Sequence, residues 1–301
     1  MTSLRALIAT ELSEPQSAVI TTVARVLMER LQGDAVLFYG STLRTGDLDG
    51  VQDFYVLRAS PSSSRPGWSM LWPDISYHEI DVARQIVRAK VATMPLDVFR
   101  KSASGVLLDT TIWTRFVQPS ALLSARDASV RDRVVDAIAL AAVTAATFAA
   151  LHGPVTARPL DYWRSLFKAT YDTELRVEAP GRHEQIVAHQ PARYERLLPL
   201  AWQKAGIAFE ERDGYISPRL RQGQIEIIAG AWCARAGCGR WLNAARLIKA
   251  AFTFDGAARY ALWKIERHTG VRVALTPWRE RHPILSAPGV LWRVWRSGAG
   301  R

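Results

Sequence analysis

A glycine and a serine end one predicted strand, and an aspartate lies inside the next. Residues 36–44 read Val-Leu-Phe-Tyr-Gly-Ser-Thr-Leu-Arg, and Asp53 follows within a second β-rich run at 51–57. Gly40 lets the backbone approach a phosphate closely, and Ser41 adds a hydroxyl donor. A carboxylate beside a polyphosphate needs a divalent metal between them, and Mg²⁺ binds one or two carboxylates together with phosphate oxygens. The pattern predicts a nucleotidyltransferase site with Asp53 and Ser41 as its catalytic residues and Mg²⁺ on Asp53.

The second metal carboxylate has several candidates. Common nucleotidyltransferases carry Asp-x-Asp on this strand, but Tyr55 occupies the second place here. Asp47 and Asp49 lie in the preceding turn and are candidate metal ligands, although turn aspartates more often bond to their own backbone. Glu79 and Asp81, on the following predicted strand, are further candidates.

Apolar spacing and turn residues predict the elements that position this site. The first 125 residues contain a helix followed by short β-rich runs bounded by Gly, Asp and Ser, which is typical of an α/β unit with a mixed sheet. The expected helix covers residues 13–32, and the expected strands cover residues 35–39, 51–57, 75–82 and 85–94.

From residue 129 the pattern becomes helical, with expected helical segments at 131–151, 160–170, 182–206 and 223–236. We therefore expect three regions. The first is an α/β nucleotidyltransferase-like mixed-sheet domain at 1–125. The second is a mostly α-helical domain at 126–235, for which a winged-helix-like form is one interpretation. The third is a basic, Trp-rich helical region at 236–301.

The charge of the chain favours an anionic partner. The formal net charge is +11, and 33 of the 39 basic residues are Arg, whose planar guanidinium suits phosphate. The last 66 residues carry twelve basic and three acidic side chains, so +9 of the charge lies there, together with five of the eleven Trp. Basic residues interleaved with Trp fit an anionic membrane surface, although a packed helix with a solvated basic face has the same composition. The expected surface residues are Trp278, Trp292, Trp295, Arg293 and Arg296.

The sequence predicts a cytoplasmic chain. Cys233 and Cys238 have no His cluster beside them, which favours neither a zinc site nor a disulfide framework. Glu11 interrupts the N-terminal apolar residues, so no export signal is expected. The longest apolar run, residues 137–151, has about 15 residues, fewer than the roughly 20 that a spanning helix needs.

Tyr39-Gly-Ser41 with Asp53-Phe54 resembles the Tyr-Gly-Ser-Gly and Asp-Phe signature of one enzyme family. This is the mitochondrial translocator assembly and maintenance family, peripheral phosphatidate cytidylyltransferases that make CDP-diacylglycerol. Further similar segments follow in the family's order, at residues 115–119, 137–154, 170–176 and 244–264.

The chain also departs from the family pattern. Thr42 replaces the Gly after the Ser, Gln118 replaces a Lys, and Thr173-Glu174 replaces Gly-Asp. Nucleotidyl transfer remains the expectation with these three changes.

The resemblance implies a reaction between CTP and phosphatidate. The phosphate oxygen of phosphatidate attacks the α-phosphorus of CTP, and diphosphate leaves. Asp53 would hold Mg²⁺ while Gly40 and Ser41 hold the triphosphate, on the inner face of the cell membrane. The other nucleotide-binding residues that it implies are Arg88 or Lys90, Arg115, Tyr171 and Arg176.

Two alternatives share the same sequence features. A nucleotidyltransferase acting on a soluble acceptor would keep Gly40, Ser41 and Asp53 without needing a lipid. A nonenzymatic basic module that binds nucleic acid would need only the charge, and its affinity would fall steeply with salt. The chain shows no nucleic-acid motif beyond that charge, so no specific nucleic acid is expected.

Overall fold

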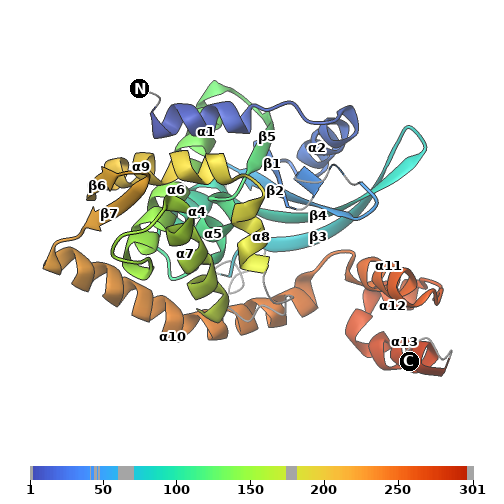
Figure 1. Cartoon of the computed structure of the whole chain (residues 1–301). Helices are drawn as coiled ribbons and strands as arrows, with labels where there is room; N and C mark the ends of the chain where they lie inside the picture. The colour runs from blue at the N-terminus through green and yellow to red at the C-terminus, as the bar shows by residue number, and fades with distance from the viewer. Residues whose placement is uncertain are drawn as a thin grey trace.

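The computed structural model of the chain describes residues 3–40, 42–43, 46, 48–59, 71–173 and 182–296. A five-stranded mixed sheet forms with helices on both sides, and further helices and a small hairpin follow it along the chain (Figure 1). The predicted α/β opening followed by helices is confirmed.

The sheet has the strand order β3-β4-β2-β1-β5. Its strands are β1 (Ala35–Tyr39), β2 (Val51–Arg58), β3 (Asp74–Val82), β4 (Gln85–Pro95) and β5 (Ser120–Ala125). β2 and β4 pair in parallel, and the other three pairings are antiparallel. The four predicted strands are thus confirmed to within one residue at either end. β5 was not predicted, because Ser-Ala-Leu-Leu-Ser-Ala has few residues with high β-propensity.

The N-terminal segment forms two helices where the sequence predicted one. They are α1 (Leu4–Leu12) and α2 (Ala18–Arg30). Ser13 follows the last turn of α1, whereas the hydroxyl of Ser17 accepts a hydrogen bond from the Ile20 N–H and starts α2. The predicted start at residue 13 was therefore wrong, because the cap that satisfies the free N–H groups lies four residues later.

The two faces of the sheet bury different clusters. α2 covers one face, where Val23 and Leu27 pack on Phe38 and Phe54. The other face belongs to a larger cluster that also takes in α1 and the helices from α4 (Leu96–Ala103) onward. Because that cluster runs from Leu4 to Ile228, the expected regions 1–125 and 126–235 share one core.

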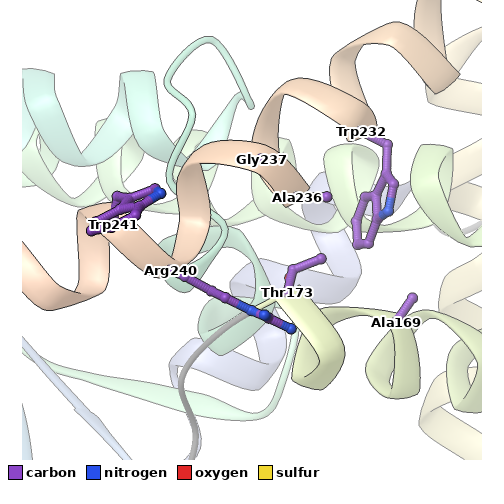
Figure 2. A pocket seen from close by; sticks show the side chains of 7 residues that line it. All are labelled: Ala169, Thr173, Trp232, Ala236, Gly237, Arg240 and Trp241. Atoms are coloured by element: carbon purple, nitrogen blue, oxygen red, sulfur yellow. The ribbon is translucent and has the colours of Figure 1, made fainter.

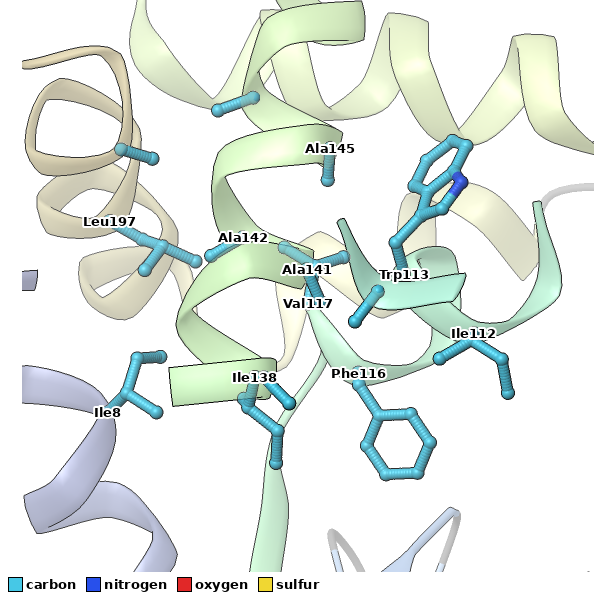
Figure 3. Packing of buried hydrophobic residues seen from close by; sticks show 14 of the residues in the cluster. Ile8, Ile112, Trp113, Phe116, Val117, Ile138, Ala141, Ala142, Ala145 and Leu197 are labelled. Carbon is cyan, nitrogen blue, oxygen red and sulfur yellow. The ribbon is translucent and has the colours of Figure 1, made fainter. Parts of the chain in front are cut away.

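The central helix of the larger cluster is α6 (Ala128–His152). Its small side chains Ala141, Ala142 and Ala145 are fully buried, which lets neighbouring helices approach closely (Figure 3). Within the described part of the chain it is the one helix long and apolar enough to cross a membrane by length and composition. In its most apolar window, however, 61% is buried inside the protein. α6 therefore has the burial of a core helix.

The remaining elements complete the chain. The predicted helical segment at 182–206 consists of two helices, and a hairpin that was not predicted follows it. These elements are α5 (Thr111–Phe116), α7 (Pro159–Thr173), α8 (Arg182–Ala188), α9 (Pro191–Ala205), β6 (Ala208–Arg212), β7 (Tyr215–Arg219), α10 (Gln222–Thr253), α11 (Ala257–Thr269), α12 (Pro277–Arg281) and α13 (Pro283–Arg296). α10 crosses the expected boundary at 235/236 without a break.

Two ion pairs attach α10 to the α/β part of the chain. The Lys249 Nζ donates to the Leu71 carbonyl at 2.6 Å and to Asp74 Oδ1 at 2.5 Å. Arg246 Nη1 donates to Asp109 Oδ1 at 2.7 Å. A backbone bond from the Tyr77 N–H to the Asp255 carbonyl at 2.8 Å then holds the start of the next helix against β3. These contacts fix where α11 lies.

Replacing Lys249 by Met should loosen this attachment. Lys249 is 3% exposed, so Met fills a similar volume but leaves the Leu71 carbonyl without its donor. We expect a loss of about 1–3 kcal/mol in the free energy of unfolding, measured by urea denaturation. Lys168→Met, at an exposed position on α7, is the matched control. Equal stability of the two variants would contradict the role of Lys249.

Candidate functional site

Gly40 and Asp53 meet at one end of the sheet. Tyr39 pairs with Asp53 across β1 and β2, so the residue after Tyr39 lies beside the aspartate. Gly40 has φ +104°, and a Cβ placed on it would lie 3.2 Å from Asp53 Oδ2. A side chain at position 40 would be strained by the backbone and would crowd the carboxylate. Glycine is therefore required for Asp53 to lie against the end of β1.

Two cations accompany the carboxylate. Lys90 is the β4 residue that pairs with Asp53, and Arg115 comes from α5. Burial raises the pKa of Asp53, while the charges of Lys90 and Arg115 oppose that rise. Burial lowers the pKa of Lys90, and Asp53 opposes that change in turn. The site thus combines one half-buried carboxylate with two cations, which leaves an excess of positive charge for an anion.

Tyr55 explains how Arg115 is held. Arg115 Nη1 donates to the Tyr55 hydroxyl at 3.0 Å, and its Cζ lies 5.2 Å from the centre of the Tyr39 ring. Tyr55 is fully buried and lies two residues after Asp53, at the position where the sequence analysis looked for a second acid. Here that position supplies a hydrogen-bond acceptor for a guanidinium instead of a second acid. Sequence reasoning identified the substitution but not this contact.

α11 adds two residues that sequence reasoning did not assign to the site. The Tyr260 ring lies 5.5 Å from that of Tyr77, the β3 residue paired with Lys90. Burial raises the pKa of Tyr260, and the charge of Asp53 adds to the rise. Lys264, one turn further along α11, acts electrostatically on Lys90. The signal in the sequence was the pair Tyr260 and Lys264 at i,i+4, which share one helix face.

Arg88 lies two residues from Lys90 and has different neighbours. Its Cζ lies 5.3 Å from the Trp263 ring, and its Nε lies 3.7 Å from Glu79 Oε1. The Arg267 guanidinium also lies 5.4 Å from the Trp263 ring. Arg88 therefore contacts α11, whereas Lys90 is the β4 cation adjacent to Asp53 in the register.

The other acids that the sequence offered as metal ligands make contacts of their own. Asp49 is exposed, and its carbonyl accepts a hydrogen bond from Arg267 Nη1 at 2.6 Å. Glu79 accepts from the Tyr77 hydroxyl at 3.0 Å, and Asp81 accepts from the Arg84 N–H in the β3–β4 turn at 2.9 Å.

Four predicted residues remain to be placed. Ser41, Asp47 and Arg176 lie outside the described residues. Tyr171 is half-buried on α7 and packs against the larger core cluster.

We call the end of β1 where Gly40 meets Asp53 the corner. A metal at the corner would have Asp53 as its protein ligand. Among the residues that the structure describes, no group of three or more His, Cys, Asp or Glu side chains could hold a metal ion. Mg²⁺ in phosphate-transfer sites commonly takes one or two carboxylates plus substrate phosphates and waters, without an all-protein cage. One half-buried carboxylate beside Gly40 fits an ion that arrives with a polyphosphate.

A separate cavity of about 510 Å³ lies between α7 and α10. Its walls include Thr173 on α7 and Trp232, Arg240 and Trp241 on α10 (Figure 2). None of its lining residues belongs to the group around Asp53, so the cavity is distinct from the corner at Gly40.

Comparison with known proteins does not identify the chain: no protein-family model matches it, and no curated protein matches it. The resemblance described above therefore depends on the quoted motif residues.

Replacing Asp53 by Asn should not destabilise the protein at neutral pH. The raised pKa of Asp53 means that its ionised form is disfavoured in the folded state, so the wild type loses stability as the pH rises from the ordinary aspartate value to the raised one. We expect the melting temperature of Asp53→Asn to equal or exceed that of the wild type at pH 8.

The advantage of the variant should shrink as the pH is lowered towards the ordinary aspartate pKa of about 3.9, because the unfolded chain then takes up the proton as well. Thermal denaturation across pH 4–8 measures the difference in melting temperature between the variant and the wild type. Asp213→Asn is the control, because Asp213 is exposed and its φ of +53° suits Asn. A variant that melts several degrees below the wild type at pH 8 would refute the electrostatic description.

Proposed function

We propose that the chain is a nucleotidyltransferase that transfers the cytidylyl group of CTP to phosphatidate, giving CDP-diacylglycerol and diphosphate. The observation that supports it most directly is the Asp53 carboxylate against Gly40, with Lys90 and Arg115 beside it. We also propose that the sheet domain is a nucleotidyltransferase-like domain. CTP and phosphatidate as substrates come from the motif resemblance.

The cations address the main barrier to this reaction. Both substrates are anions, and two unit charges 4 Å apart repel by about 4 kcal/mol at an effective dielectric constant of 20. Lys90, Arg115 and Lys264 place positive charge where the two phosphates would meet. Fixed cations in a buried site stabilise the charge that develops on the departing diphosphate. A phosphomonoester is largely ionised at neutral pH, so phosphatidate needs no general base.

Asp53 would hold Mg²⁺ in this site, with the remaining ligands supplied by the nucleotide. When bound, the ion offsets charge between the carboxylate and the phosphates and acts as a Lewis acid. Gly40 leaves room for the phosphates next to Asp53, and Arg115 is held in orientation by Tyr55. Tyr260 and Lys264 bound the site from α11.

The last helices fit a peripheral location on the inner face of an anionic membrane. Trp278 on α12 and Trp292 on α13 are 54% and 57% exposed. Arg293 and Arg296 are exposed too, and the Arg296 Cζ lies 5.2 Å from the Trp292 ring. The side chain of Trp295 lies outside the described residues. Each Lys or Arg near an anionic bilayer contributes about 1 kcal/mol to binding.

Turnover of CTP with phosphatidate tests the function. In the presence of Mg²⁺ and phosphatidate vesicles, the wild type should form CDP-diacylglycerol, and Asp53→Asn should lower the rate by about 10²-fold or more. Radiolabelled CTP and lipid extraction measure the product, with Asp213→Asn as the control.

Soluble phosphate and hydroxyl acceptors form the comparison arm of this assay. Product from one of them and none from phosphatidate would overturn the lipid assignment. Equal product from the wild type and Asp53→Asn would overturn the catalytic one.

Replacing Trp292 by Ala should weaken membrane binding. The substitution removes an exposed aromatic side chain next to Arg296, and we expect about tenfold weaker binding to anionic vesicles. Vesicle sedimentation at two salt concentrations measures it, and binding should also fall as salt rises. Tyr215→Ala, at an exposed aromatic on the β6–β7 hairpin, is the control. Equal loss in both variants would argue against a docking role for α13.

A further inference from the structure

The cavity between α7 and α10 is open to solvent and lies beside a point where the two helices approach closely. A Cβ on Gly239 would lie 2.9 Å from the Thr173 carbonyl, so glycine is needed where α10 passes the end of α7. A Cβ on the neighbouring Gly237, which lines the cavity, would meet no atom within 4 Å. Position 237 is exposed and faces the open side of the cavity, whereas position 239 is buried against the end of α7.

The lining is mostly apolar, with one cation. Small side chains and two indole rings form most of the wall, and the Thr173 hydroxyl is directed to its own helix, where it donates to the Thr170 carbonyl at 2.9 Å. Trp232 is fixed against α6, since its ring lies 5.3 Å from that of Phe148. Trp241 is 79% exposed and belongs to the outer part of the wall. Arg240 supplies positive charge (Figure 2).

α10 connects this cavity with the cations of the corner. Arg246 lies six residues beyond Arg240, which is about 9 Å along the helix axis. Arg246 binds Asp109 at 2.7 Å. Burial raises the pKa of Tyr55, and the charges of Arg115, Asp109 and Arg246 all act on it. α10 thus has Arg240 at the cavity and Arg246 beside Asp109.

We propose that this cavity binds an acyl chain of the acceptor phospholipid, with the lipid phosphate directed along α10 towards Arg246 and Arg115. This inference rests on the proposed function for the identity of the lipid. A volume of about 510 Å³ lies within the range of small-molecule sites, and mostly apolar walls suit an acyl tail. The cavity would then select acceptors by their chains, separately from the headgroup chemistry at Asp53.

Filling the cavity tests the inference without any turnover. Gly237→Leu places a side chain in the empty space, and Gly230→Leu is the matched control. Gly230 is on the same helix, is exposed, has no atom within 4 Å of a Cβ and does not line the cavity. Both substitutions raise helix propensity to the same degree, so neither should harm folding.

The probe is dioctanoyl phosphatidate, titrated calorimetrically in the absence of CTP, with glycerol 3-phosphate as the headgroup alone. We expect Gly237→Leu to bind dioctanoyl phosphatidate about tenfold more weakly or worse, the effect of excluding about two methylene groups. Gly230→Leu should bind it as the wild type does, and both variants should treat glycerol 3-phosphate like the wild type. Unchanged lipid binding by Gly237→Leu, or no lipid binding by the wild type, would overturn the inference.

A second measurement tests where the acyl chain of the lipid binds. Phosphatidate brominated on its acyl chains should quench tryptophan fluorescence in the wild type, and Trp241→Phe should lose part of that quenching. Equal quenching in both proteins would show that the acyl chain binds away from Trp241. These measurements need no catalysis, so a protein that binds the lipid chain but forms no CDP-diacylglycerol would refute the proposed function and retain the cavity.

Discussion

The site depends on a half-buried carboxylate held against a glycine. Asp53 lies inside a strand, where burial disfavours its charge, and the register of β1, β2 and β4 brings Gly40 and Lys90 to it. A different register would turn the side chain to the opposite face of the sheet, because strand side chains alternate. The large apolar clusters on both faces fix that register, so the core of the protein determines the position of one acid.

The basic C-terminal part of the chain has two environments. Some of its cations make specific contacts with the sheet domain: the buried Lys249 bonds to Asp74, and the exposed Arg267 bonds to the Asp49 carbonyl. Others, such as Arg293 and Arg296, face outward beside exposed Trp292. Net charge alone therefore overstates how much of this region is available to a membrane. The residues bonded to the sheet domain hold α11 against it, and the exposed ones form the surface to which the proposed membrane binding is assigned.

The sequence predicted the strands well because apolar β-rich runs bounded by turn residues are a local signal. It predicted Gly40 and Asp53 as neighbours because the two lie on consecutive strands. It did not predict that Tyr55 would hold Arg115, since that contact joins residues 60 positions apart and depends on the packing of α5. The position of α11 could not be predicted either, because it also depends on contacts between residues far apart in the sequence. Its contacts with β3 and β4 depend on how α10 crosses the molecule, which no local pattern encodes.

Tyr55 also limits how the strand could be changed. A shorter side chain at this position would leave Arg115 Nη1 without the phenol oxygen that accepts its hydrogen bond. Because Tyr55 is fully buried, its loss would also leave a void beside Phe99 and Phe116. A change at position 55 would therefore have to be accompanied by a change in α5.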